Sequence, residues 1–315
     1  MFLPILSFIL GLVLLIWSAG RFVVGASALA KYCGLSSFLI GMIVVGFGTS
    51  APELAVSLFA ALGGSPELAL GNAYGSNIGN IALILGLTAI IFPIVIPKSA
   101  IRLDIPLLLL ATAISFVLLF FNKDVSRLDG ILLVLLFAVI ITLQIWRGIS
   151  NKAENSDNET NSKNLLSSLF WLVFGLGLLV GSSKLLVFGA TEIAKALGVS
   201  DLLIGLTVVA IGTSLPELAS SVIAAKKGDT ALALGNIVGS NIFNSLIVVG
   251  ISAIICPMNV DSLILQRDLP VTGFLTLLLF LFGLHLKKEP KIGRVKGSFL
   301  LLSYIVYTAF LFCSA

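Results

Sequence analysis

The sequence predicts an all-α polytopic membrane protein in which ten transmembrane helices form two inverted five-helix repeats. Three observations lead to this fold class: the composition, a series of ten apolar stretches, and an internal repeat. Of the 315 residues, 58% are hydrophobic and 11% are charged, and the mean hydropathy is +1.14. A soluble domain carries about 25% charged residues, so this much apolar surface requires lipid as its solvent.

Each of the ten apolar stretches has the length that crosses a bilayer, roughly 20 residues. The first stretch comes before the first basic residue, Arg21. Because a secretory signal begins with a basic segment, we expect a retained helix there. The expected spans are 3–24, 36–62, 67–91, 103–121, 129–147, 165–188, 201–225, 230–256, 269–286 and 297–313.

The basic residues are distributed unevenly between the loops. Of the 19 Lys and Arg residues, 14 fall in the loops after the first, third, fifth, seventh and ninth spans, and 5 fall elsewhere. Since cytoplasmic loops carry the excess of Lys and Arg, the loops after the odd-numbered spans are expected to face the cytoplasm. We therefore expect a multi-pass protein of the cell (inner) membrane with both termini outside. The net charge of +4 is accounted for by these loops and does not indicate nucleic-acid binding.

A polar stretch at 148–164 divides the chain into repeats 1–147 and 165–315. It contains almost no apolar residues, so it is predicted to be a disordered cytoplasmic linker. A shift of 164 residues aligns 46–80 with 210–244, with 21 identities in 35 positions. Because five is an odd number, two copies of a five-helix unit in series must enter the membrane from opposite sides. This inverted-repeat arrangement is found in many secondary transporters.

Two acidic residues, Glu53 and Glu217, lie deep inside expected spans at equivalent positions of the two repeats. A carboxylate at that depth is costly and indicates a functional site. The alternatives are an ion pair with a buried Lys or Arg, for which no mid-membrane basic residue is available, and protonated structural glutamates.

A proline directly precedes each of these acids. Proline inside a helix removes one hydrogen bond and clashes with the carbonyl four residues earlier, so we expect a helix break that frees backbone oxygens. The alternative is an ordinary proline kink satisfied by nearby hydroxyls. The residues of the two expected breaks are Gly48, Thr49, Ser50 and Pro52, and Gly212, Thr213, Ser214 and Pro216.

The segments GNAYGSNIGN and GNIVGSNIFN follow the two breaks. Their serines and asparagines offer neutral oxygens, which hard cations such as calcium prefer. The alternative is that these side chains only make polar contacts between helices. The presence of the segment in both repeats favours an ion-binding site. The candidate ligands are Ser76, Asn80, Ser240 and Asn244.

The motif GTSxPE followed by GNxxGSNxxN, present twice, resembles the calcium/cation antiporter superfamily and particularly its prokaryotic sodium/calcium exchangers. The resemblance covers the whole chain. It implies calcium ligands at Glu53, Glu217, Thr49 and Thr213. It also implies sodium ligands at Ser50, Ser76, Asn80, Ser214, Ser240, Asn244, Gly46, Ala210 and both glutamates.

The expected function is antiport of calcium against sodium by alternating access, without enzymatic activity or a cofactor. Calcium ions, sodium ions and the bilayer are the expected partners, and the chain is expected to act as a monomer. A calcium/proton antiporter and a passive cation channel remain open as alternatives, and a membrane-embedded hydrolase ranks last. Some relatives carry Asp where this chain has Asn244, so potassium co-transport is not expected and the sodium stoichiometry stays open.

Overall fold

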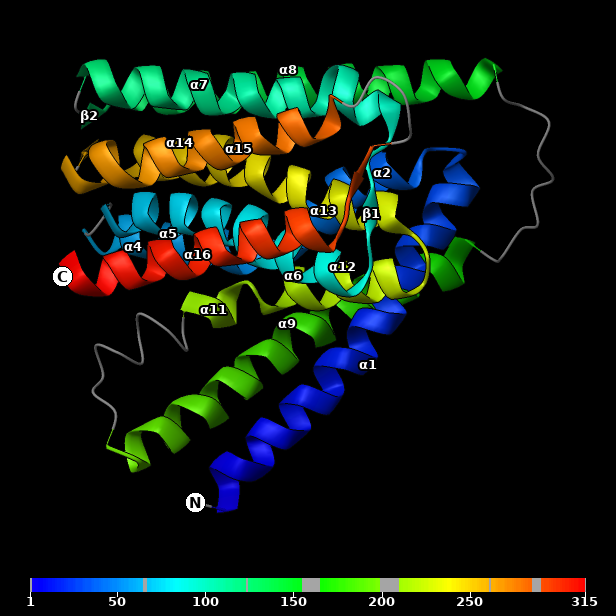
Figure 1. Ribbon diagram of the computed structural model, residues 1–315, viewed down its shortest axis with the longest axis horizontal. Coiled ribbons are helices and arrows are strands. Elements are labelled where there is room, and N and C mark those ends of the chain that lie inside the picture. Colours follow the sequence, from blue (N-terminus) through cyan, green and yellow to red (C-terminus); the bar gives the residue numbers. More distant parts are fainter. Residues whose placement is uncertain are drawn as a thin grey trace.

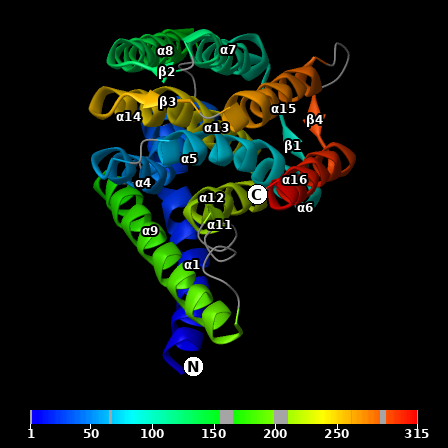
Figure 2. The same cartoon turned by 90° about the vertical axis from the view of Figure 1, so that its left-hand side faces the viewer.

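The protein is an assembly of packed helices in which one pair stands at an angle to the rest (Figure 1). The computed structural model describes residues 2–64, 67–122, 124–154, 165–198, 210–260, 262–284 and 290–314. In both views, α1 (Phe2–Cys33) and α9 (Leu165–Ala196) lie side by side and extend away from the other helices (Figures 1 and 2). The long helices of the main body lie stacked beside this pair.

Most helices of the first half are interrupted rather than continuous. After α1 come α2 (Ser37–Ile40), the π-helix η1 (Gly41–Gly46), α3 (Phe47–Thr49), α4 (Ala51–Leu62), α5 (Glu67–Ile78), the π-helix η2 (Gly79–Leu85), α6 (Gly86–Ile91), β1 (Ile94–Val95), the π-helix η3 (Ala100–Asp104), α7 (Ile105–Asn122), β2 (Asp124–Val125) and α8 (Arg127–Glu154).

The second half follows nearly the same order of elements. After α9 come α11 (Ala210–Thr213), α12 (Leu215–Lys226), α13 (Thr230–Phe243), the π-helix η5 (Asn244–Val248), α14 (Val249–Ile255), β3 (Met258–Asn259), the π-helix η6 (Ile264–Asp268), α15 (Leu269–Gly283), β4 (Lys291–Ile292) and α16 (Arg294–Ser314).

The helices account for most of the expected membrane spans. In the described part of the chain, eight helical segments are long and apolar enough to cross a membrane, and the bent pair Ser37–Thr49 and Ala51–Leu62 makes up to nine. The span expected at 201–225 is described only from Ala210 onward. The innermost spans are Thr230–Ile255 and Glu67–Ile91, with 83% and 72% of their apolar windows buried. These spans carry the repeated asparagine motif.

The expected linker begins later than the sequence suggests. Helix α8 continues to Glu154, so the first seven residues of the 148–164 stretch are helical and not disordered. At the start of this stretch Gly148 packs closely against Leu35 and against Leu39 of α2, and an added Cβ would meet their side chains. The remainder, 155–164, lies outside the described residues.

Helices α1 and α9 run antiparallel with their backbones in close contact. A Cβ placed on Gly11 would lie 2.6 Å from the backbone nitrogen of Leu186. At the equivalent position of the other half, a Cβ on Gly175 would lie 2.9 Å from the backbone nitrogen of Phe22. Phe22 and Leu186 are themselves related by the same 164-residue shift, so the two contacts are reciprocal. Small residues permit such close approach of helices in a membrane.

Two short pairs of antiparallel strands, which the all-α prediction did not include, join the ends of neighbouring helices. β1 pairs with β4 through Ile94 and Ile292, and β3 pairs with β2 through Met258 and Val125. Ile94 and Met258 are equivalent under the 164-residue shift. Equivalent segments of the two halves therefore form the strand pairs that connect the helix ends.

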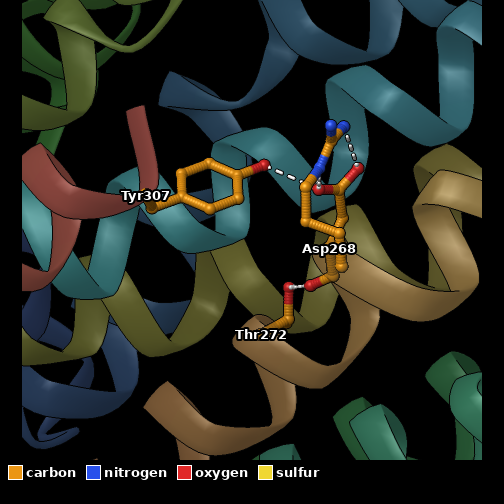
Figure 3. A network of polar contacts seen from close by, with 4 residues as sticks. Asp268, Thr272 and Tyr307 are labelled. Atoms are coloured by element: carbon orange, nitrogen blue, oxygen red, sulfur yellow. Dashed lines mark hydrogen bonds and ion pairs between the residues drawn. The ribbon is translucent and has the colours of Figure 1, made fainter. Parts of the chain in front are cut away.

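A carboxylate anchors the start of α15 to α16 (Figure 3). Asp268, which is 5% exposed, accepts a hydrogen bond from the Tyr307 hydroxyl at 2.9 Å and pairs with Arg267 at 2.7 Å. In the first half, the equivalent Asp104 accepts from Nε2 of Gln144 at 3.1 Å and so joins α7 to α8. The two aspartates have the same place in the fold but different partners.

Candidate cation site

Both expected helix breaks are present, and the prolines occupy a more favourable place than the sequence suggested. The first break falls at Ser50, between α3 and α4, where the chain bends by 43°. The second falls at Ser214, between α11 and α12. Pro52 and Pro216 then lie in the first turn of the new helices, where the missing N–H costs no helical hydrogen bond.

The breaks leave fewer free backbone oxygens than expected. The carbonyl of Gly212 accepts a hydrogen bond from the Ser183 hydroxyl of α9 at 2.8 Å, and the Ser50 amide donates to the carbonyl of Gly46 at 3.1 Å. The expectation of an unpartnered carbonyl is therefore wrong at Gly212, because a serine of α9 satisfies it. The carbonyl of Gly46 accepts from the Ser240 hydroxyl at 3.1 Å.

Glu53 and Glu217 lie in the first turns of α4 and α12 and are each 1% exposed. Each carboxylate meets the serine of the opposite break. Ser50 donates to Oε1 of Glu217 at 2.9 Å, and Ser214 donates to Oε1 of Glu53 at 3.5 Å. The two breaks therefore face each other, and each acid is held by the other half of the chain.

The asparagine segments cross beside the acids. Nδ2 of Asn80 donates to Oδ1 of Asn241 at 3.0 Å, and Nδ2 of Asn77 donates to Ser245 at 2.8 Å. Asn80 lies in η2, and Asn244 begins η5. π-Helical turns occur frequently at functional sites, where they interrupt the regular hydrogen-bond ladder. The two segments are thus held together by amides at the positions where their helices are irregular.

Several buried oxygens at this crossing have no hydrogen-bond partner among the described residues. Buried polar atoms in native proteins are normally paired, so unpartnered oxygens on these segments are candidate ligands for an ion. These oxygens are Oε2 of Glu53, Oε2 of Glu217, Oδ1 of Asn77, Oδ1 of Asn80 and Oδ1 of Asn244, and Nδ2 of Asn244 is also without a partner.

The other candidate residues lie in the same region. Thr49 is fully buried and donates to Oδ1 of Asn236 at 3.1 Å. Ser76 and Ser240 are buried on α5 and α13, and Thr213 ends α11. Ala210 begins α11 at the edge of the described residues.

Sequence reasoning missed the residues that hold the acids in place. Nδ2 of Asn72 donates to the Glu53 carbonyl at 3.0 Å, and Nδ2 of Asn236 donates to the Glu217 carbonyl at 3.2 Å. Both asparagines also contact serines of α4 and α12. The signal was present, because Gly-Asn opens both copies of the motif.

The sodium/calcium exchanger protein family model matches residues 3–146 and 167–313. The chain belongs to this family. Like the exchangers with which it groups, it is a multi-pass membrane protein, with eight to nine candidate spans among the described residues.

Individual relatives of this exchanger match it over nearly its full length. CaxA of Alkalimonas amylolytica is 45% identical over 312 residues, which cover 97% of this chain and 98% of CaxA. The inner membrane protein YrbG of Escherichia coli (strain K12) is 38% identical and covers 96% of this chain, with 95% of its own length matched. The solved structure of the sodium-calcium exchanger NCX_Mj, soaked without sodium and calcium, superimposes with a TM-score of 0.87 at 35% identity, covering 98% of this chain and 99% of NCX_Mj.

Proposed function

We propose that this protein is an antiporter that exchanges calcium for sodium across the cell membrane. The observation that carries the proposal is the pair of buried carboxylates, Glu53 and Glu217, each with one oxygen bonded to a serine of the other half and one oxygen unpartnered. Two such oxygens at one crossing supply the negative charge that a divalent cation needs. The likeness to the exchanger NCX_Mj supports the same reading.

Calcium is proposed to bind between the two carboxylates, with Thr49 and Thr213 completing its oxygen ligands. Calcium takes 6–8 oxygen ligands, more than two acids supply, so neutral oxygens must contribute. Sodium ions are proposed to share Glu53 and Glu217. Their further ligands would be Ser50, Ser76, Asn80, Ser214, Ser240 and Asn244, together with the backbone carbonyls of Gly46 and Ala210.

Shared ligands explain why the two ions would exchange. Calcium and sodium draw on the same carboxylates, so binding of one excludes the other. An empty pair of buried carboxylates repels itself and is poorly solvated, which disfavours passage of the unloaded protein between its two states. Two carboxylates neutralise one calcium ion, whereas several sodium ions would leave a net positive charge at the site.

The exchange is proposed to proceed by alternating access in a ten-helix inverted repeat. The antiparallel contacts between α1 and α9 support this architecture, because the contact of Gly11 with Leu186 is repeated by that of Gly175 with Phe22. The reciprocal strand pairs support it as well. We place both termini outside the cell membrane, from the distribution of Lys and Arg, and propose that the monomer is the functional unit.

The decisive experiment is uptake of radioactive calcium into proteoliposomes, with sodium, potassium and proton gradients imposed separately. We expect an outward sodium gradient alone to drive uptake, with no contribution from potassium. Uptake driven by a proton gradient without sodium would replace sodium coupling with proton coupling. Calcium flux that follows the membrane voltage without any counter-ion gradient would indicate a passive channel and overturn the antiporter.

The two serines that contact the acids are expected to have unequal effects. The Ser50 bond to Glu217 is 2.9 Å long, whereas the Ser214 bond to Glu53 is 3.5 Å. A hydrogen bond to a charged group contributes about 1.5–3 kcal/mol, and the longer bond contributes less. Ser50→Ala is therefore expected to raise the calcium concentration that gives half-maximal transport by about tenfold. Ser214→Ala is expected to raise this concentration by less.

Titration of the transport rate with calcium tests this order, with Ser303→Ala as the control. Ser303 lies on α16 and bonds only to the carbonyl of Phe299 in the described structure, so its removal should leave calcium activation unchanged. Equal effects of Ser50→Ala and Ser214→Ala would contradict the difference in geometry.

A further inference from the structure

A cationic and aromatic cluster lies where α1 and α9 meet the end of α12, away from the cation site. The guanidinium carbon of Arg21 lies 4.6 Å from the ring centre of Trp171 and 5.4 Å from that of Trp17. The two indoles touch edge to face, with ring centres 6.0 Å apart. Because an aromatic face attracts a cation, the rings fix the position of the Arg21 side chain across both helices.

A second cation is held beside the first. Nζ of Lys227, the residue after α12, donates to the carbonyl of Gly20 at 2.7 Å. Gly20 directly precedes Arg21. Partial burial lowers the pKa of Lys227, and the nearby charge of Arg21 lowers that pKa further. The two positive side chains are thus brought together by the fold.

Neither cation has a carboxylate partner within the described ranges. The ion pairs found there involve Lys195 and Arg267 instead. The acid nearest in sequence to Lys227 is Asp229, and its two oxygens already accept from the Leu232 amide and the Ser27 hydroxyl, at 3.1 Å each. Two neighbouring cations that form no ion pair with a described carboxylate favour binding of an anion.

The surroundings of the pair indicate where that anion comes from. Trp17, Phe170 and Phe174 are 43%, 54% and 47% exposed, and they belong to helices that cross the membrane. Tryptophan and arginine at the end of a membrane span are typical of the headgroup level of a bilayer. Basic pockets between transmembrane helices bind anionic headgroups on the cytoplasmic side, which is the side expected for both Arg21 and Lys227.

We infer that Arg21 and Lys227, with Trp17 and Trp171 as a wall, form a binding site for the phosphate of an anionic phospholipid headgroup. The occupant is a lipid rather than free phosphate, because the aromatic side chains around the cations are exposed on membrane-crossing helices. The bound headgroup would link the α1–α9 pair to the end of α12. This site goes beyond the proposed exchange activity and does not depend on it.

Tryptophan fluorescence provides the test, because two of the three tryptophans line the site. The third, Trp146, is 65% exposed on α8 and is replaced in a Trp146→Phe background. The full chain is placed in phosphatidylcholine nanodiscs that contain a fixed fraction of either brominated phosphatidylglycerol or brominated phosphatidylcholine. We expect the brominated anionic lipid to quench the tryptophan fluorescence more strongly than the brominated phosphatidylcholine does. For a pocket with two cations, the expected preference of the site for the anionic lipid is about tenfold.

The double variant Arg21→Gln/Lys227→Gln is expected to abolish this preference. The control Lys98→Gln/Arg102→Gln removes two other exposed cations that are expected on the same side of the membrane, and it should retain the preference. Inorganic phosphate at millimolar concentration should not relieve the quenching. If the double variant does not fold, Lys227→Gln alone serves, since its only described bond is to Gly20, and it should reduce the preference several-fold.

Three outcomes would overturn the site. The first is an unchanged preference in a folded variant that lacks one or both of these cations. The second is an equal loss in the Lys98/Arg102 control, which would mean that anionic lipid gathers around any basic surface of the protein. The third is displacement by inorganic phosphate, which would assign the cations to a soluble anion. None of these readouts requires calcium or sodium transport.

Discussion

Glu53→Gln is expected to abolish sodium-driven calcium uptake and calcium binding. The substitution keeps the size of the side chain but removes one of the two buried negative charges that meet at the helix breaks. In the calcium-bound state the carboxylate and the ion form a buried pair of opposite charges, and removing one partner from such a pair costs about 3–5 kcal/mol. Each 1.4 kcal/mol is a factor of ten in affinity. Calcium affinity should therefore fall at least about 100-fold, and Glu217→Gln should have an effect of the same order.

Calcium-dependent thermal stability in detergent measures this loss directly. A ligand that binds only the folded state raises the unfolding temperature, so calcium should stabilise the unmodified protein and leave Glu53→Gln unaffected. Glu67→Gln is the matched control, because Glu67 is an exposed acid at the start of α5. If Glu53→Gln keeps both calcium-dependent stabilisation and uptake, the assignment of the site is wrong.

Gly239→Ala is expected to lower both stability and transport. A Cβ at this position would lie 2.7 Å from the Met42 carbonyl carbon, and a backbone atom cannot move away as a flexible side chain does. Overpacking of this kind costs about 1–3 kcal/mol. The forced separation of α13 from η1 would also move Ser240 away from the carbonyl of Gly46, to which it bonds at 3.1 Å.

The unfolding temperature and the initial rate of calcium uptake should both fall in this variant. Gly273→Ala on α15 is the control, since a Cβ there meets no described atom within 4 Å. Alanine favours helix more than glycine does, so the control should unfold at the same temperature or slightly higher. A Gly239→Ala protein as stable and active as the unmodified chain would contradict the close approach of α13 and η1.

The parts of the fold that could be predicted are those governed by hydrophobicity and by repetition. Apolar stretches predicted most of the spans, because a helix must satisfy its backbone groups internally in lipid. The 164-residue repeat predicted that Glu53 and Glu217 occupy equivalent places, and the structure brings both to one crossing. Their roles as ion ligands stay predictions.

The parts that could not be predicted depend on contacts between distant segments. The capture of the Gly212 carbonyl by Ser183 requires α9 to pack on α11, and nothing near Gly212 in the sequence signals it. The π-helical turns and the two strand pairs likewise arise from how helices meet, not from local composition. The bond from Asn72 to the Glu53 carbonyl spans 19 residues, too far for helical periodicity to reveal it.

The two halves of the crossing repeat the same residues but do not make the same bonds. Asn80 donates to Asn241, whereas the equivalent Asn244 has no partner among the described residues. In the proposed exchange, an ion arriving from one side of the membrane and an ion arriving from the other would meet different arrangements of oxygens. The concentration that half-saturates transport should then differ between the two faces. The equilibrium reached by the two ion gradients would not change, because a catalyst of transport alters rates and not the final distribution.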